Sequence, residues 1–175
     1  MTSDQPNTIP YFLRPAQPAD KALLFQLFAE SQWQLEMLRA NEALWRSLID
    51  MQYRGREITY AQVCPTAEDS ILCVRNDAGG EVPVGRILVN KQPGCWRIVD
   101  IAVLAALRGR GLGAGALGNC IKEAATAGAR LELRVTPGNP ARLLYERLGF
   151  TVVSEDAMDV EMAWSSEAPT MSPAG

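Results

Sequence analysis

The sequence predicts an α+β fold with about seven strands in a mixed, mostly antiparallel sheet and about four helices. Two observations predict it. Hairpin-like strand segments occupy the first half of the chain and its C-terminal end, and one strand-helix-strand unit lies between residues 96 and 136. Strands joined through a helix run parallel, whereas hairpin strands run antiparallel. The sequence therefore predicts one parallel pair in an otherwise antiparallel sheet.

The chain begins with an edge strand and a helix. "YFLR" (Tyr11 to Arg14) is the first strand, and Pro15 closes it. Asp20 is the expected N-cap of a helix that runs to about Glu30. The apolar stripe of this helix consists of Leu23, Leu24, Leu27 and Phe28.

A second helix begins near Asn41, and Pro65 closes the segment. Because of Gly55, the sequence does not fix the residue at which this helix ends. Its expected apolar positions are Leu44, Leu48, Met51 and Ile58, which recur at helical spacing.

Three strands come next. Ser70–Asn76 and Val82–Asn90 flank the turn "DAGG" and are predicted to form a hairpin. "WRIVDIAV" (Trp96 to Val103) is rich in β-branched residues and is predicted to be a buried strand. A helix that ends at Gly128 follows it.

The C-terminal third completes the sheet. Arg130–Thr136 is the strand parallel to Trp96–Val103, and a helix runs from Pro140 to Leu148. "FTVVS" and "VEMAW" form a closing hairpin around "EDAMD".

Length and composition predict a single domain, residues 11–164, between flexible ends at residues 1–10 and 165–175. The net charge of −3 argues against nucleic acid or an anionic membrane as a partner. No apolar run reaches the length of a membrane span, and the N-terminus lacks an apolar signal core. We therefore expect a cytoplasmic protein.

The absence of histidine excludes Ser-His and Cys-His nucleophile pairs. It also removes the commonest metal ligand, and the four cysteines form no C-x-x-C pair. We expect no metal and a chemistry that depends mainly on positioning.

Glycines dominate the junction between the Trp96–Val103 strand and the helix that follows it. The sequence there is Arg108-Gly109-Arg110-Gly111-Leu112-Gly113-Ala114. At the start of a helix the first amide groups lack partners and the dipole is positive, so anions bind there. Two arginines add positive charge, and the junction is predicted to bind phosphate. The alternative is a tight connection without a ligand.

Together with "NPARLLYERLGF" (Asn139 to Phe150), this junction resembles the acyl-CoA-dependent N-acyltransferases of the GNAT superfamily. That family's signature is Gln or Arg, two residues, Gly, one residue, then Gly or Ala, which Arg108 to Gly113 matches. The second block begins 26 residues after Gly113. The resemblance implies the GNAT fold, in which the central parallel strands splay apart.

The resemblance also implies a set of cofactor-binding residues. The loop from Arg108 to Ala114 would bind the pyrophosphate of acetyl-CoA. The backbone of Ile101, Ala102 and Val103 would pair with the pantetheine arm; their alternative role is that of core strand residues. In many family members the asparagine stands seven residues before the tyrosine, whereas here Gly138 does and Asn139 stands six before Tyr145.

Asn139 would bind the cofactor near its thioester, and Tyr145 would protonate the departing thiolate. Each residue also has a structural alternative. Asn139 could cap the helix that starts at Pro140, and Tyr145 could be a core aromatic.

The implied reaction is direct transfer of an acetyl group from acetyl-CoA to a primary amine in a ternary complex. A backbone amide such as that of Val103 would stabilise the oxyanion. Asp100 is the preferred general base, with an ion pair to an arginine such as Arg97 as its structural alternative.

The acceptor, a small molecule or a peptide, would bind between Ser31 and Cys64 and at the loop from Glu155 to Asp159. The aromatic candidates there are Trp33, Trp45, Tyr53 and Tyr60. The protein is expected to be a monomer or a homodimer.

Two other functions are weighed. A non-catalytic acyl-CoA-binding or sensor module would keep the phosphate loop and not need Tyr145. A dinucleotide-binding oxidoreductase would use Gly113 to Gly118 as G-x-G-x-x-G, with Glu132 as the ribose-binding acid. Against the second stands the single strand-helix-strand unit, which comes late in the chain.

Overall fold

The computed structural model describes residues 9–32, 35 and 40–166. The predicted flexible ends, 1–10 and 165–175, lie almost wholly outside these residues. The chain groups into two compact units, Met1–Leu88 with Asp100–Gly113, and Val89–Val99 with Ala114–Gly175. The boundaries of the expected single domain, 11 and 164, stay a prediction.

A seven-stranded sheet forms the framework, with the strand order β1-β2-β3-β4-β5-β7-β6. Its strands are β1 (Tyr11–Pro15), β2 (Glu68–Arg75), β3 (Glu81–Gln92), β4 (Cys95–Val103), β5 (Arg130–Val135), β6 (Thr151–Glu155) and β7 (Val160–Trp164). β4 and β5 are parallel, while β1 with β2, β5 with β7 and β6 with β7 are antiparallel. The predicted fold class, a mixed sheet with a central parallel pair, is confirmed.

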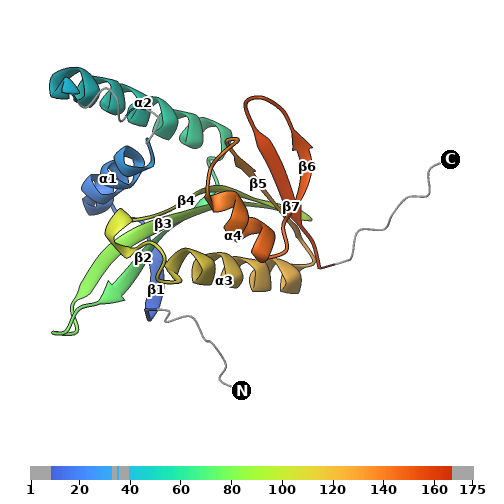
Figure 1. Ribbon diagram of the computed structural model, residues 1–175. Helices are drawn as coiled ribbons and strands as arrows, with labels where there is room; N and C mark the ends of the chain where they lie inside the picture. The colour runs from blue at the N-terminus through green and yellow to red at the C-terminus, as the bar shows by residue number, and fades with distance from the viewer. Residues whose placement is uncertain (1–8, 33–34, 36–39, 167–175) are drawn as a thin grey trace. The chain divides into compact units, whose positions relative to one another are not determined.

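Four α-helices accompany the sheet (Figure 1). They are α1 (Lys21–Ser31), α2 (Glu42–Val63), α3 (Leu112–Ala127) and α4 (Ala141–Arg147). α3 ends just before Gly128, as predicted, and the φ of +62° at Gly128 is the left-handed conformation typical of a glycine that follows a helix. α4 is one residue shorter at each end than predicted, because Pro140 is its N-cap and Leu148 its C-cap.

Asp20 precedes α1 as predicted, but its carboxylate does not cap that helix. It accepts from the Gln17 amide at 2.7 Å, closing the 3-10 turn Pro18–Asp20, and it pairs with Arg14 at 2.7 and 2.8 Å. The Arg14 guanidinium holds the pKa of this buried carboxyl below its usual value. Asp20 therefore ties the start of α1 to β1.

The first unit has a core in which α1, α2, β1 and β2 meet. Leu24, Ile71 and Cys73 are buried there together. Phe12, Ala16, Leu23 and Tyr53 pack against them. The ring of Tyr53 also meets Phe25 edge-on at 5.4 Å, so α2 rests on α1 through this tyrosine.

α2 runs without interruption through Gly55 to Val63, and the Asn41 side chain caps it by accepting from the Leu44 amide. The predicted apolar face is wrong. Leu44, Met51 and Ile58 are 52%, 63% and 57% exposed, and Ile49 is the buried residue of the helix. The reason is that α2 packs through the opposite face. There Arg56 lies over the ring of Phe28, and Glu57 forms an ion pair with Arg86.

In the second unit, the β4–β5 register joins Cys95 with Arg130 and continues to Ile98 with Leu133. β5 is buried at alternate positions, Leu131, Leu133 and Val135, as expected for a strand with one covered face. β6 and β7 form the predicted hairpin, with a register irregularity between Val152 and Ser154.

Candidate functional site

The glycine-rich junction lies where the sequence predicted it, between β4 and α3. Gly109 and Gly111 have φ of +75° and +79°, which L-residues rarely adopt. These two glycines turn the chain so that α3 can begin at Leu112. The amides of the first turn of α3 have no acceptor within the helix, so they can donate to an anion.

Glu30 of α1 contacts the segment between β4 and the glycines of this junction. The Glu30 carboxylate accepts from the Ala105 amide at 2.7 Å and lies 3.8 Å from Arg108. Arg108 itself donates through Nε to the Val103 carbonyl at 3.0 Å and remains 49% exposed. Arg108 thus has structural contacts through Nε and Nη2, while about half of its side chain is exposed.

Gly85 of β3 is a residue that the sequence analysis missed. A Cβ at this position would lie 2.7 Å from the Ala102 carbonyl oxygen, closer than atoms can approach. The next backbone contact, from the Leu104 amide to the Val84 carbonyl at 2.9 Å, fixes the chain just before the junction. A glycine inside an apolar strand pattern is the signal that predicts such a close approach.

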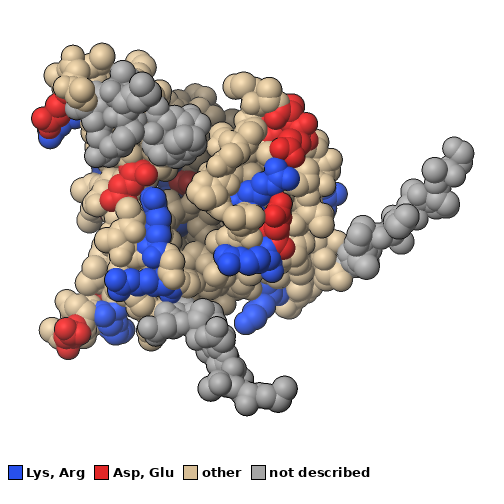
Figure 2. Space-filling model, in the orientation of Figure 1, with Lys and Arg blue, Asp and Glu red and all other residues tan. Residues whose placement is uncertain are grey.

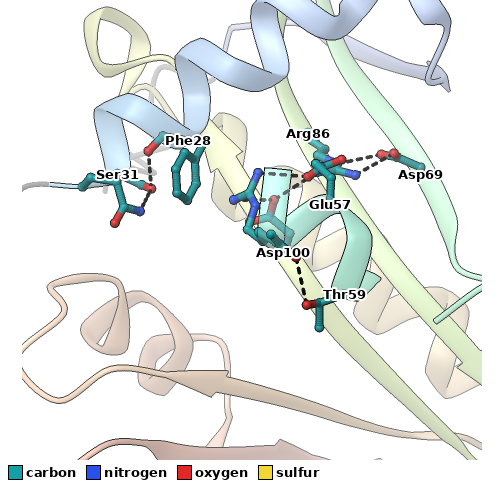
Figure 3. Close-up of polar contacts among 10 residues, drawn as sticks. Phe28, Ser31, Glu57, Thr59, Asp69, Arg86 and Asp100 are labelled. Carbon is teal, nitrogen blue, oxygen red and sulfur yellow. Dashed lines mark hydrogen bonds and ion pairs between the residues drawn. The ribbon is translucent and has the colours of Figure 1, made fainter. Parts of the chain in front are cut away.

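Asp100, the expected base, lies on β4 in a cluster of five charged side chains, which we call the Arg86 cluster (Figure 3). Its members are Arg56, Glu57, Asp69, Arg86 and Asp100. They come from α2, β2, β3 and β4, so the cluster ties this helix to three strands of the first unit.

Arg86 is the centre of this cluster and is 3% exposed. It forms a two-bond pair with Asp69 at 2.9 and 2.8 Å and reaches Glu57 at 3.0 Å. The sequence analysis missed Arg86 and its partners. The available signal was an arginine inside the apolar run "VPVGRILVN", because a buried guanidinium requires buried carboxylates.

Asp100 is the carboxylate with the longest contacts in the cluster. Arg56 and Arg86 both approach the same oxygen, Oδ2, at 3.4 and 3.5 Å. Burial raises the pKa of Asp100, and the two arginines only partly oppose this effect. A carboxylate with a raised pKa accepts a proton more readily than an exposed aspartate does.

The predicted alternative for Asp100, a pair with Arg97, is wrong in its partner. Arg97 pairs with Glu132 across the parallel strands at 3.2 Å. Adjacent residues of a strand face opposite sides of the sheet, and Arg97 is three positions from Asp100. Asp100 does form ion pairs with arginines, but these are Arg56 of α2 and Arg86 of β3.

Ile101, Ala102 and Val103 continue β4 beyond Ile98, the last residue in its register with β5. All three are half-buried. Their position between Asp100 and the junction is the one that the resemblance implies for backbone contacts to a cofactor arm.

The second predicted block lies in the other unit, at α4. Asn139 follows Gly138, whose φ is +79°, and its Oδ1 accepts from the Ala141 amide at 2.9 Å. The Asn139 side chain therefore caps the first amide of this helix from the position before its N-cap residue, Pro140, in keeping with the structural alternative. Tyr145 is 8% exposed, and its ring lies edge-on to Phe150 at 6.1 Å.

The expected acceptor segment is partly described. Trp33 lies outside the described residues. Tyr53 and Tyr60 surround the Arg56 guanidinium at 5.7 and 5.3 Å, together with Phe28 at 4.5 Å. Burial raises the pKa of Tyr60 to about 12. These aromatics therefore support a charged side chain of the chain itself.

The described residues offer neither a metal site nor a membrane span. No group of three or more His, Cys, Asp or Glu side chains in residues 9–32, 35 and 40–166 could hold a metal ion. Within the same residues, no helix combines the length and the apolar character needed to cross a bilayer. On the face drawn in Figure 2, basic and acidic side chains are interspersed.

Comparison with protein families decides the assignment. Residues 32–150 match the acetyltransferase (GNAT) family. The chain belongs to the GNAT family. The predicted family and an acetyl-transfer chemistry are therefore confirmed, and the match spans the junction at Arg108–Gly113 and the block at Asn139–Phe150. A search of curated proteins found no match.

Solved structures show the same GNAT fold. The PaiA N-acetyltransferase of Thermoplasma acidophilum, in complex with coenzyme A, is 18% identical with a TM-score of 0.65, over 90% of this chain and 99% of that one. PH1933 of Pyrococcus horikoshii OT3 is 20% identical with a TM-score of 0.63, over 91% and 100%. An acetyltransferase of Thermus thermophilus is 21% identical with a TM-score of 0.60, over 91% and 99%.

Proposed function

We propose that this GNAT protein transfers the acetyl group of acetyl-CoA to a primary amine by direct attack. The observation that carries the proposal is the junction at Arg108–Gly113. Two glycines with positive φ lead into the first turn of α3, and two arginines alternate with them. Such a junction suits the pyrophosphate of coenzyme A, and PaiA, which shares the fold, is complexed with coenzyme A.

The roles of the site residues form part of the proposal. The amides and arginines of Arg108 to Ala114 bind the pyrophosphate, and the backbone of Ile101, Ala102 and Val103 pairs with the pantetheine amides. Asn139 contacts the cofactor near its thioester. Tyr145 donates its hydroxyl proton as the carbon–sulfur bond breaks and coenzyme A leaves as a thiol.

We further propose that Asp100 accepts the proton of the attacking amine. An alkylammonium must lose a proton before nitrogen can attack the thioester carbon. The carbon–nitrogen bond then forms to give a tetrahedral oxyanion, and the carbon–sulfur bond breaks as this intermediate collapses. The raised pKa of the buried Asp100 and its long contacts to both arginines support this role. The Val103 amide is the proposed donor to the oxyanion.

The experiment is a free-thiol assay with acetyl-CoA and a panel of amines: polyamines, aminoglycosides, amino acids and peptides with free N-termini. Acceptor-dependent release of coenzyme A, with an acetylated amine as the other product, is the expected result. If acetyl-CoA binds and no amine increases thiol release, the chain is instead an acyl-CoA-binding or sensor module.

The role of Asp100 is tested by the pH dependence of kcat/KM. Activity should fall as the pH drops through the raised pKa of Asp100, because the protonated carboxyl cannot accept a proton. Asp100→Asn should lower kcat about 100-fold and remove this acidic limb. An unchanged acidic limb in the variant would exclude Asp100 as the base.

A further inference from the structure

The exposed side of α2 carries a row of apolar residues, Leu44, Met51 and Ile58, which we call the α2 ridge. Each is more than half exposed. The three are seven residues apart, close to two helical turns, so they lie in one line that spans about 21 Å of the helix. A continuous apolar row on a surface is typical of an interaction site.

The packing of α2 does not use this ridge. Ile49 is buried on the other side of the helix, and the rings of Tyr53 and Tyr60 lie on that side beside Arg56. The Arg86 cluster holds the same side to the sheet through Glu57. The ridge therefore plays no part in the packing that stabilises this unit.

Gly55 lies on the ridge between Met51 and Ile58. A Cβ at this position would meet no atom within 4 Å, so the fold does not require glycine there. Glycine within a helix costs about 1 kcal/mol relative to alanine. Because glycine has no side chain, a second helix can approach the backbone of α2 more closely at this point of the ridge.

The ridge is self-complementary about Met51. A twofold axis beside Met51 places two helices antiparallel, with Leu44 opposite Ile58 of a second copy and Met51 opposite its own counterpart. Asp50 and Arg54 lie on one flank of the ridge and pair within the helix at 2.8 Å. In an antiparallel pair this flank faces its own copy, and Arg54 lies two residues, about 3 Å along the helix, from Asp50 of the second copy, within reach of its long side chain.

We propose that the α2 ridge is the contact surface of a homodimer, formed by two antiparallel α2 helices related by a twofold axis beside Met51. The apolar row supplies the buried surface, Gly55 permits close approach, and two Asp50–Arg54 pairs fix the antiparallel orientation.

Sedimentation equilibrium of the full chain at about 100 µM tests the proposal, because association depends on protomer concentration. The expected species is a dimer. Met51→Glu places two carboxylates at the axis and should yield the monomer. The matched control is Val63→Glu on the same helix, 69% exposed and about 120° around the helix from Met51, which should remain dimeric. A monomeric wild type, or a dimer unchanged by Met51→Glu, would overturn the proposal.

A charge exchange tests the orientation. Arg54→Asp places like charges opposite each other and should weaken the dimer at least about tenfold. Asp50→Arg with Arg54→Asp restores opposite charges across the axis and should return the affinity to the wild-type value. Circular dichroism checks that each variant is folded. Failure of the double variant to recover would exclude the antiparallel pairing.

Discussion

The two regions proposed to bind acetyl-CoA are built in different ways. At the Arg108–Gly113 junction the functional groups belong to the backbone, and the positive φ of Gly109 and Gly111 orients them. At α4 they belong to the side chains of Asn139 and Tyr145, and Asn139 already caps the helix. The difference teaches that a backbone motif can be assigned to a ligand more directly than a side-chain motif, because Gly109 and Gly111 have no side chain that could serve a structural contact instead.

The largest effect is expected at the junction. Gly111→Asp forces a side chain into a left-handed backbone conformation and adds a negative charge where the pyrophosphate would lie. Affinity for acetyl-CoA should fall at least about 100-fold in calorimetry. The matched control is Gly113→Ala, whose Cβ would meet Val103 at an ordinary 4.0 Å and should bind almost as wild type. Unchanged binding by Gly111→Asp would refute the phosphate role.

At α4, by contrast, the expected effect is on turnover and not on affinity. Tyr145→Phe keeps the ring that packs on Phe150 and removes the hydroxyl. Because a general acid acts in the transition state, kcat should fall about 100-fold while acetyl-CoA affinity stays within about twofold. Steady-state kinetics and calorimetry on the same preparation measure both quantities. Equal turnover would show that the hydroxyl has no acid role.

A smaller effect is expected for Arg108, which combines both kinds of contact. Arg108→Met removes the charge and also the bond from Nε to the Val103 carbonyl. Affinity for acetyl-CoA should fall about tenfold at low ionic strength and less at high salt, because Arg108 is half exposed and screened. Titrations at two salt concentrations measure this, and a loss independent of salt would indicate a purely structural role.

The smallest effect separates the two roles of Asn139. Asn139→Ala removes the cap and should lower the free energy of unfolding by about 1 kcal/mol. Asn139→Asp keeps the capping oxygen and removes the amide donor. This variant should keep its stability and lose about threefold in acetyl-CoA affinity. Denaturant unfolding and calorimetry measure the two effects, and wild-type affinity in Asn139→Asp would leave Asn139 with the cap alone.

The features that could be predicted from the sequence are those set by residues close together in the chain. The strand-to-helix junction, the Gly128 end of α3 and the start of α2 near Asn41 each depend on residues near in sequence, and all are present. The parallel pair followed from the rule that two neighbouring strands joined through a helix run parallel.

What the sequence did not predict depends on contacts between distant elements. The helical period of Leu44, Met51 and Ile58 indicated a buried face, yet α2 packs through the opposite side. The partners of Asp100 lie on α2 and β3, 44 and 14 residues away, so no spacing rule could find them. Arg86 was hidden in an apolar run whose arginine required carboxylates from other elements.

Calorimetric titration of the purified chain with acetyl-CoA tests the central claim most directly. The account predicts a saturable heat of binding to the wild type, and loss of that heat in Gly111→Asp but not in Gly113→Ala. A wild type that gives no heat with acetyl-CoA, or variants that bind equally well, would contradict the assignment of the Arg108–Gly113 junction to the pyrophosphate of coenzyme A.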